Sequence, residues 1–468
     1  MQAIATFFRF GERRTNLSTE LRAGLTTFMV MAYIIAVNPG ILSVATEGKG
    51  PPLIPTIVAT ALTAGILCLA MGLATNYPFA LAAGLGLNAV VAYQLILGKG
   101  MPWEQAMAII VWEGVLITIF VLTGLREQLM DAIPMSLKRA IAVGIGLFIL
   151  LIGLVDGGFV VGGGGTPLGL GALTTPAILV FLVGLFVALA LMARNIRGAL
   201  LISIVIATVF AIALRAVFPE TSGLADGAAK VPDHWITDFG ADSPFSTLLA
   251  PLTSGALINV WTNPAYSFIT IALTVFSLML SDFFDTMGTV IGVGEEAGLV
   301  DDNGRLPGIR NVLLVDSIGA VLGGLFSTSS NTTYIESAAG VSDGGRTGLV
   351  AVVVGFFFLL AILFAPIIAI VPAQATAPAL VVVGYLMFTI AKEIDWTDID
   401  DLFPALVTIV VMPFTYTITD GIAAGFITFV FLKVVKGKTH EIHPLLWIAA
   451  AAFALYFAIP WVQQTFGI

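Results

Sequence analysis

The chain has 468 residues, of which 58% are hydrophobic and only 10% are charged, and its mean hydropathy is +1.02. A soluble core of this size does not need so few charges, and apolar runs recur at the ~20 residues that cross a bilayer. The composition therefore indicates a polytopic α-helical membrane protein. The formal net charge of −9 argues against a nucleic-acid partner, and the lone Cys68 excludes an internal disulfide and favours neither a metal cluster nor redox chemistry.

The first apolar run begins near Leu21, behind the charged stretch FRFGERRTNLSTELR, and no small-residue cleavage site follows a short apolar core. We therefore expect no removable signal peptide. Spans are predicted at about 21–44, 54–74, 79–96, 104–123, 139–156, 176–193, 199–217, 267–293, 311–326, 327–341, 348–370, 376–392, 402–415 and 417–435. Boundaries carry errors of ~3 residues. The apolar tail Leu445–Ile459 is left over, as an extra span or an interfacial helix.

Most basic residues lie at the same side of the membrane in this arrangement of predicted spans. With the N-terminus in the cytoplasm, 16 of the 20 lysines and arginines fall inside, and orientation follows this bias. The inside set is Arg9, Arg13, Arg14, Arg22, Arg126, Lys138, Arg139, Arg194, Arg197, Arg305, Arg310, Arg346, Lys392, Lys433, Lys436 and Lys438. The sequence thus predicts a multi-pass protein of the plasma (inner) membrane with a cytoplasmic N-terminus.

The two halves of the chain show weak internal matches. Ile133-Pro134 and Val371-Pro372 each precede an apolar helix, and the short segments that begin at Asn76 and Asn331 each run to a small-residue stretch with glycine. Fourteen spans are twice seven, and an odd-numbered unit must invert when it is repeated in a membrane. The sequence therefore favours an inverted repeat whose third and tenth segments are half-helices preceded by extended chain. Paired broken segments of this kind are the best sequence pointer to a transporter's binding site.

Three carboxylates lie inside these spans: Asp282 and Asp285 in the eighth, and Glu336 at the start of the second half-helix. A charge near the bilayer centre costs at least ~2.5 kcal/mol on insertion scales, so such acids normally face a cavity, a partner or a substrate path. Asp282 and Asp285 are close enough to repel, so at least one of them is expected to hold a proton at neutral pH. The alternative is that Asp285 only caps backbone groups or bonds a neighbouring hydroxyl, as an N-cap of a helix over Thr286–Val293 would.

Several other side chains are weaker candidates for the binding site. Asp316 is expected to support Asp282 from the next span or to cap its own helix, and Asn88 to contact a ligand or to fix the broken backbone. The aromatic residues Phe79, Phe283, Phe284 and Tyr334 flank the polar positions, and a flat heteroaromatic ligand would stack on one of them. All three histidines fall in predicted loops, so proton coupling would need carboxylates.

The stretch LSDFFDTMGTVIGVGEEAGLVDDNGRLPGIRNVLLVDSIGAVLGGLFSTSSNTTYIESAAGVSDGGRTG resembles the AzgA-like purine permeases, a branch of the nucleobase:cation symporters that also include uracil and xanthine permeases. The match begins at TTFMVMAYIIAVNPGIL and continues through MPFTYTITDGIAAGFITFVFLK, so it covers nearly the whole chain. The resemblance implies an all-α fold of about 14 segments in two inverted seven-segment repeats, with short strands in segments 3 and 10. The implied division is 1–20 cytoplasmic N-terminus, 21–132 and 267–370 core domain, 133–217 and 371–435 gate domain, 218–266 external loop, and 436–468 tail.

The resemblance also implies site residues. The family's substrate carboxylates fall on Asp282 and Glu336, its second span-eight acid on Asp285 and its span-three asparagine on Asn88. Members of the uracil branch have a histidine close to the position that Thr286 occupies in this sequence. The protonation scheme of that branch therefore does not transfer to this chain. The predicted substrate contacts are Asp282, Glu336, Asn88, Gly86, Phe283, Tyr334 and Ile335, the proton-coupling acids Asp282, Asp285 and Glu336, and the supporting residues Asp316 and Thr286. A homodimer through the gate domain is expected, and neither metal nor cofactor.

The function expected is proton symport of purine bases (adenine, guanine, hypoxanthine) into the cell. The rivals are a uracil or xanthine permease, and an anion exchanger of the same architecture, although two acids at the site repel anions. An intramembrane aspartyl protease also needs two membrane aspartates, but its Gly-Xaa-Gly-Asp context is missing. The preferred purine, the choice between H⁺ and Na⁺ and the role of the 218–266 loop stay open.

Overall fold

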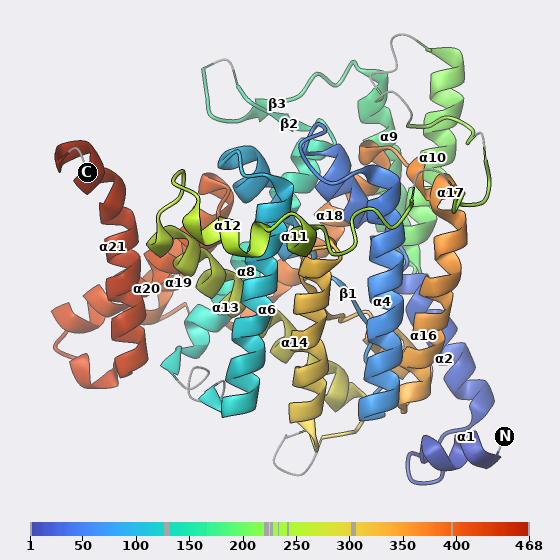
Figure 1. Cartoon of the computed structure of the whole chain (residues 1–468), viewed down its shortest axis with the longest axis horizontal. Coiled ribbons are helices and arrows are strands. Elements are labelled where there is room, and N and C mark those ends of the chain that lie inside the picture. The colour runs from blue at the N-terminus through green and yellow to red at the C-terminus, as the bar shows by residue number, and fades with distance from the viewer. Residues whose placement is uncertain are drawn as a thin grey trace.

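The computed structural model describes residues 2–125, 132–163, 165–219, 224, 228–232, 234–240, 243–300, 306–394 and 396–466, with side chains up to Ala458. Arg126 and Arg305, which the orientation prediction uses, and parts of the 218–266 loop lie outside these residues. The chain is mostly helical, and its long helices run roughly side by side (Figure 1).

Ten helical segments of the described chain are long and apolar enough to cross a membrane. They are Leu17–Val44 (α2 Leu17–Met31, α3 Ile34–Pro39 and a π-helical turn), α4 Leu53–Thr75, α6 Trp103–Thr123, α8 Met135–Asp156, α9 Pro176–Ala193, α10 Ala199–Val217, α13 Phe268–Glu296, Gly348–Ala369 (α16 Gly348–Ala361 and α17 Ala365–Ala369), Ala373–Glu393 (α18 Ala373–Phe388 and a 3₁₀ turn) and α20 Ile418–Val435. Two 17-residue helices, α14 Ile309–Leu325 and α19 Ile399–Thr415, occupy two more predicted spans. The first span is not the single helix expected, because the helix breaks at Tyr33 and Pro39 removes a backbone N–H before the π-helical turn Gly40–Val44.

The two remaining segments are short and meet each other. Strand β1 (Leu81–Ala83) leads into the half-helix α5 (Leu85–Ala89) and a π-helical stretch to Gly98, and strand β4 (Asn331–Thr333) leads into α15 (Ser337–Ser342). The strands pair antiparallel, with Ala82 opposite Thr332, and every strand residue is buried. Protein thus covers the non-helical backbone at this depth, as a membrane interior requires. The prediction of short strands in segments 3 and 10 is confirmed.

The helices pack in two groups. The first helix group joins α2, α4, α6, α13, α14 and α16, and the second helix group joins α8, α9, α10, α18, α19 and α20. These groups contain the segments predicted for the core and gate domains, although the division into two domains stays a prediction. At the edge of the molecule α21 (Pro444–Phe466) packs against α20 and α13, so the apolar tail forms one helix (Figure 1). Whether it crosses the bilayer stays open.

Small residues bring α6 and α14 into backbone contact. A Cβ added at Gly114 would lie 2.5 Å from the backbone nitrogen of Val321, and one at Gly324 would lie 2.7 Å from that of Val111. Close approach through small residues is the usual way in which membrane helices associate. This contact fixes the middle of α6, which carries Glu113, against α14.

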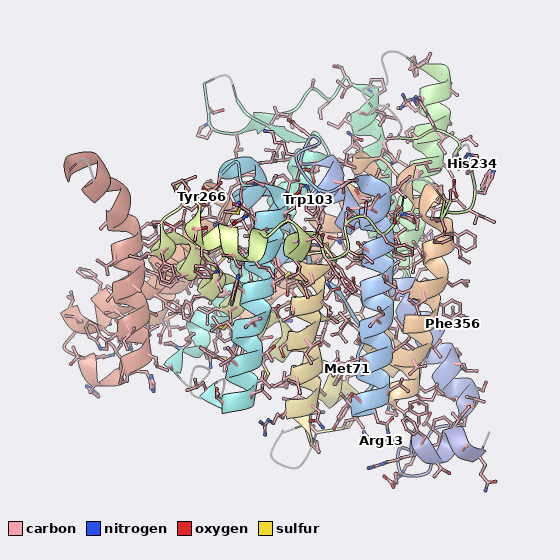
Figure 2. All side chains as sticks on the ribbon, viewed as in Figure 1. Arg13, Met71, Trp103, His234, Tyr266 and Phe356 are labelled. Carbon is pink, nitrogen blue, oxygen red and sulfur yellow. The ribbon has the colours of Figure 1, made fainter. Side chains whose placement is uncertain are left out.

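Outside the bundle lie the short helices α1 (Gln2–Phe7), α11 (Ala250–Thr253) and α12 (Ala256–Thr262). The hairpin of β2 (Val160–Val161) and β3 (Gly169–Leu170), which the sequence did not predict, lies at the end of the molecule opposite α1 (Figure 1). Figure 2 shows His234 at the periphery of the molecule, and it belongs to no helix or strand, in agreement with its predicted loop position.

Candidate functional site

A pocket lies where the paired strands and half-helices of the first helix group face α8 and α18 of the second. Its lining residues are Tyr33, Gly84, Leu85, Gly86, Leu87, Ile145, Ile149, Ser281, Asp285, Thr289, Thr332, Thr333, Tyr334, Ile335, Glu336, Val383 and Met387. It therefore brings together five of the predicted site residues, Gly86, Asp285, Tyr334, Ile335 and Glu336. The lining combines two carboxylates with an apolar wall from α8 and α18, and it contains no lysine, arginine or histidine among its described residues.

The two pocket carboxylates are held differently. Glu336 precedes the first residue of α15, and its Oε1 accepts a hydrogen bond of 2.6 Å from the hydroxyl of Tyr33. Asp285 lies inside the continuous helix α13, so the alternative that it caps a helix beginning at Thr286 is wrong, whereas the alternative of a bond from a neighbouring hydroxyl matches its contact with Thr332. Among the described residues, its Oδ2 accepts one long hydrogen bond of 3.4 Å, from the hydroxyl of Thr332. Asp285 thus keeps most of its acceptor capacity for a ligand.

Asp282 faces away from the pocket. Its side chain is 1% exposed, and its Oδ2 accepts a hydrogen bond of 2.5 Å from Ser330, just before β4. The hydroxyl of Thr286 lies 3.4 Å from Asp282 Oδ1 and donates at 2.8 Å to Asp316 Oδ2. The three-residue offset along α13 therefore turns Asp285 toward the pocket and Asp282 toward α6 and α14.

Asp316 connects strand β4 to helix α14. Its Oδ1 accepts bonds from the backbone N–H of Thr333 at 2.9 Å and from the Thr333 hydroxyl at 2.8 Å. Asp316 lies in the interior of α14 rather than at a helix end. The structure places Asp316 and Thr286 beside Asp282, where the sequence put its supporting residues.

Asn88 and Phe283 are not among the described lining residues of the pocket. Asn88 is fully buried, and neither atom of its amide has a hydrogen-bond partner among the described residues. Phe283 is 1% exposed, and its ring packs edge-on against Phe284 with centroids 5.2 Å apart. The structure thus brings neither of these predicted contacts to the cavity.

Two polar residues that contact the predicted acids are absent from the sequence prediction. Tyr33 lies at the break in the first span and bonds Glu336. Glu113 lies in the middle of α6, is fully buried and adjoins the carboxyl of Asp282. The rule that an intramembrane acid marks a functional position would have found Glu113, because it is an acid inside the apolar run AIIVWEGVLITIF.

Near the loops that carry β2 and α11, the two helix groups are joined by a polar contact. The hydroxyl of Tyr93, after α5, donates at 2.6 Å to Asp156 at the end of α8. The ring of Tyr416 packs against Tyr93 at 6.2 Å and edge-on against Phe148 at 5.7 Å. Asp156 also borders a wide cavity between the loops that is separate from the pocket.

Two solved structures of transporters have a similar fold. The transmembrane domain of the cyanobacterium bicarbonate transporter BicA is similar, with a TM-score of 0.57 at 16% identity over 88% of this chain and 97% of that one. The murine anion transporter Slc26a9 in the inward-facing state is similar with a TM-score of 0.59 at 11% identity, over 90% and 69% of the two chains. At these identities the likeness shows the fold alone, and it confirms the predicted inverted-repeat architecture.

The sequence comparisons define the family within this fold. The profile of the xanthine/uracil permeases, described as "Permease family", matches residues 18–424. The adenine permease AdeQ of Escherichia coli is 39% identical over 454 residues, 97% of this chain and 95% of that one. The guanine/hypoxanthine permease PbuO of Bacillus subtilis is 39% identical over 456 residues, 97% of this chain and all of that one. The chain belongs to the xanthine/uracil permease family, and its relatives are transporters rather than enzymes.

Proposed function

We propose that this protein is a secondary active transporter that imports purine nucleobases by proton symport across the plasma (inner) membrane. The observation that carries the proposal is the pocket between the two helix groups, in which Asp285 and Glu336 face a cavity with no basic side chain among its described lining residues. The names of the relatives, adenine and guanine/hypoxanthine permeases, support the substrate class.

A purine base suits the chemistry of this lining. Its ring N–H groups donate hydrogen bonds, and the carboxylates of Asp285 and Glu336 accept them. Its ring nitrogens, and the carbonyl of guanine and hypoxanthine, accept hydrogen bonds, and the N–H groups of the first turn of α5 have no partner inside their own helix. Gly86, in that turn, lets Ile145 of α8 approach the backbone beside the pocket. The apolar side chains of Ile145, Ile149, Val383 and Met387 border the pocket and would cover the flat faces of the ring.

Proton coupling follows from placing carboxylates beside a neutral ligand. When the base covers the pocket it removes water from Asp285 and Glu336, and a desolvated carboxyl keeps its charge only while a donor satisfies it. Binding of the purine and protonation of the carboxylates therefore depend on each other. The carrier then changes conformation with the purine and the proton both bound. Alternating access would break contacts such as the Tyr93–Asp156 bond on one side of the pocket and form others on the opposite side.

An anion exchanger is the rival of the same fold, because BicA and Slc26a9 are named as bicarbonate and anion transporters. Two carboxylates without a basic partner in the described lining repel an anion, which favours the neutral base. A uracil or xanthine permease is the rival within the family. Assembly as a homodimer through the second helix group and a cytoplasmic N-terminus complete the proposal.

The test is uptake of labelled adenine, guanine, hypoxanthine, xanthine and uracil into proteoliposomes under imposed pH or Na⁺ gradients. We expect at least one of adenine, guanine and hypoxanthine to accumulate when the outside is acidic, with bicarbonate failing to compete. Accumulation driven only by Na⁺ would refute proton coupling. Uptake of uracil or bicarbonate without purine uptake would refute the substrate class.

A further inference from the structure

Glu113 is a buried acid that the pocket does not use. It lies in the middle of α6, its side chain has no exposed surface, and the contact of Gly114 with α14 fixes its position. Its carboxyl adjoins the carboxyl of Asp282 on α13 and the hydroxyl of Ser330. Three elements far apart in the sequence thus bring two acids together on the side of β4 away from the pocket.

The hydrogen atoms available to this pair can be counted. Ser330 has one hydroxyl hydrogen, and it goes to Asp282 at 2.5 Å. The hydroxyl of Thr286 is closer to Asp316, at 2.8 Å, than to Asp282, at 3.4 Å. Neither oxygen of Glu113 accepts a hydrogen bond from any described residue. The hydrogen that would satisfy two adjoining carboxyl groups here is therefore a proton on one of them.

The surroundings supply no compensating charge. None of the ion pairs among the described residues includes Glu113 or Asp282. The titratable groups facing Glu113 are Asp282 from α13 and Asp316 from α14, both acids. The helices α11 and α12 contribute no acid or base, and the stretch after α5 contributes only Tyr93, which bonds Asp156. No cluster of the described residues has the arrangement to hold a metal ion. Two ionised carboxylates in such a place repel each other strongly.

We propose that Glu113 and Asp282 hold one proton between them, and that this pair is the proton store of the transport cycle. The inference rests on the proposed proton symport and adds a residue that does not touch the substrate. One carboxyl oxygen gains its hydrogen from bulk water on the side where the purine enters, and the same O–H bond breaks on the other side to return the proton to water. Glu113 is thus a positioning residue that sets the proton affinity of Asp282.

Strand β4 connects this pair to the ligand. Side chains alternate along a strand, and here Thr332 donates toward Asp285 at the pocket, while Thr333 donates toward Asp316 on the opposite face. Ser330, next to the strand, holds Asp282. A shift of β4 when a purine binds therefore changes the donors available to Asp282, and with them the affinity of the pair for its proton.

The test is Glu113→Gln in the full-length protein in proteoliposomes, with the purine that the wild type accumulates. The amide imitates the protonated acid in size and donates to Asp282, so exchange of labelled for unlabelled purine should stay within about threefold of wild type. Across one pH unit a one-proton symporter accumulates its substrate up to about tenfold. The variant should instead reach only equal concentrations inside and outside. The matched control, Glu104→Gln near the start of the same helix, should accumulate like the wild type.

Each outcome decides between the two proposals. Uphill accumulation by Glu113→Gln equal to that of the wild type would overturn the proton pair and leave proton symport standing. If purine accumulation by the wild type does not depend on the pH gradient, proton symport is overturned, and the proposed Glu113–Asp282 proton pair is overturned with it. If Glu113→Gln does not fold, Glu113→Asp draws the carboxyl back from Asp282 while keeping an acid, and it should shift the pH optimum of uptake. An unchanged pH profile in that variant would overturn the inference.

Discussion

Gly86 lies at the contact between the two helix groups, beside the pocket. A Cβ added there would lie 2.7 Å from Cγ2 of Ile145 and 3.8 Å from Cδ1 of Ile149, both on α8. The first distance is shorter than carbon atoms tolerate, so Gly86→Ala overpacks this contact. Overpacking of a tight interior typically costs about 1–3 kcal/mol. We expect the cost to fall on the conformation in which α5 and α8 touch, which corresponds to a change of about 5–150-fold in its population.

The assay is initial purine uptake by matched amounts of purified variants in proteoliposomes. Gly86→Ala should lower uptake by that factor with little loss of folded protein. Ile145→Ala removes the clashing Cγ2, so the double variant should transport about as well as Ile145→Ala alone. The control is Gly292→Ala on α13, where an added Cβ meets nothing within 4 Å. Full activity of Gly86→Ala, or a double variant as impaired as Gly86→Ala, would refute the reasoning.

Three further predictions concern single acids. Glu336→Gln keeps the acceptor for Tyr33 but loses the charge, so purine binding measured by calorimetry should weaken by ~1.5–3 kcal/mol, and wild-type affinity would remove Glu336 from the site. Asp285→Asn removes one pocket charge and should shift the pH optimum of uptake, whereas an identical profile would show that Asp285 does not titrate in the cycle. Partial burial alone would raise the pKa of Asp343, but hydrogen bonds from Thr26 and Arg197 hold that pKa below its usual range. A depressed pKa stabilises the fold above the ordinary pKa of aspartate, so Asp343→Asn should lower the Tm at pH 7. The difference in Tm should shrink as the pH falls below about 4 and vanish only below the depressed pKa, and a constant difference would contradict this.

Much of the fold could be predicted because hydrophobic length is a local property. The predicted 176–193 and 199–217 spans coincide with α9 and α10, and the two interrupted segments became β1 and β4 with their half-helices. Pro39 marked a weak point that the prediction passed over, since a proline inside an apolar run does not say by itself whether the helix continues. The hairpin of β2 and β3 carries too few residues to give a periodic signal.

The site could be predicted only in part, because side-chain direction depends on packing. The sequence identified Asp282 and Asp285 as neighbours on one helix, but not which of them faces the pocket, since that depends on which face of α13 meets β4 and α6. Glu113 could have been found as an acid inside an apolar run, but its contact with Asp282, 169 positions further along the chain (282 minus 113), could not. Tyr33 became part of the site only through the break in its helix.

The central claim is that one proton crosses the membrane with each purine that the carboxylate-lined pocket binds. The most direct test is the internal pH of weakly buffered proteoliposomes, read with a trapped dye, when purine is added outside without any proton gradient. The account predicts that purine entry acidifies the interior in the wild type and that Glu336→Gln, which weakens binding, reduces the signal. Purine entry at the normal rate with no change of internal pH would contradict the account.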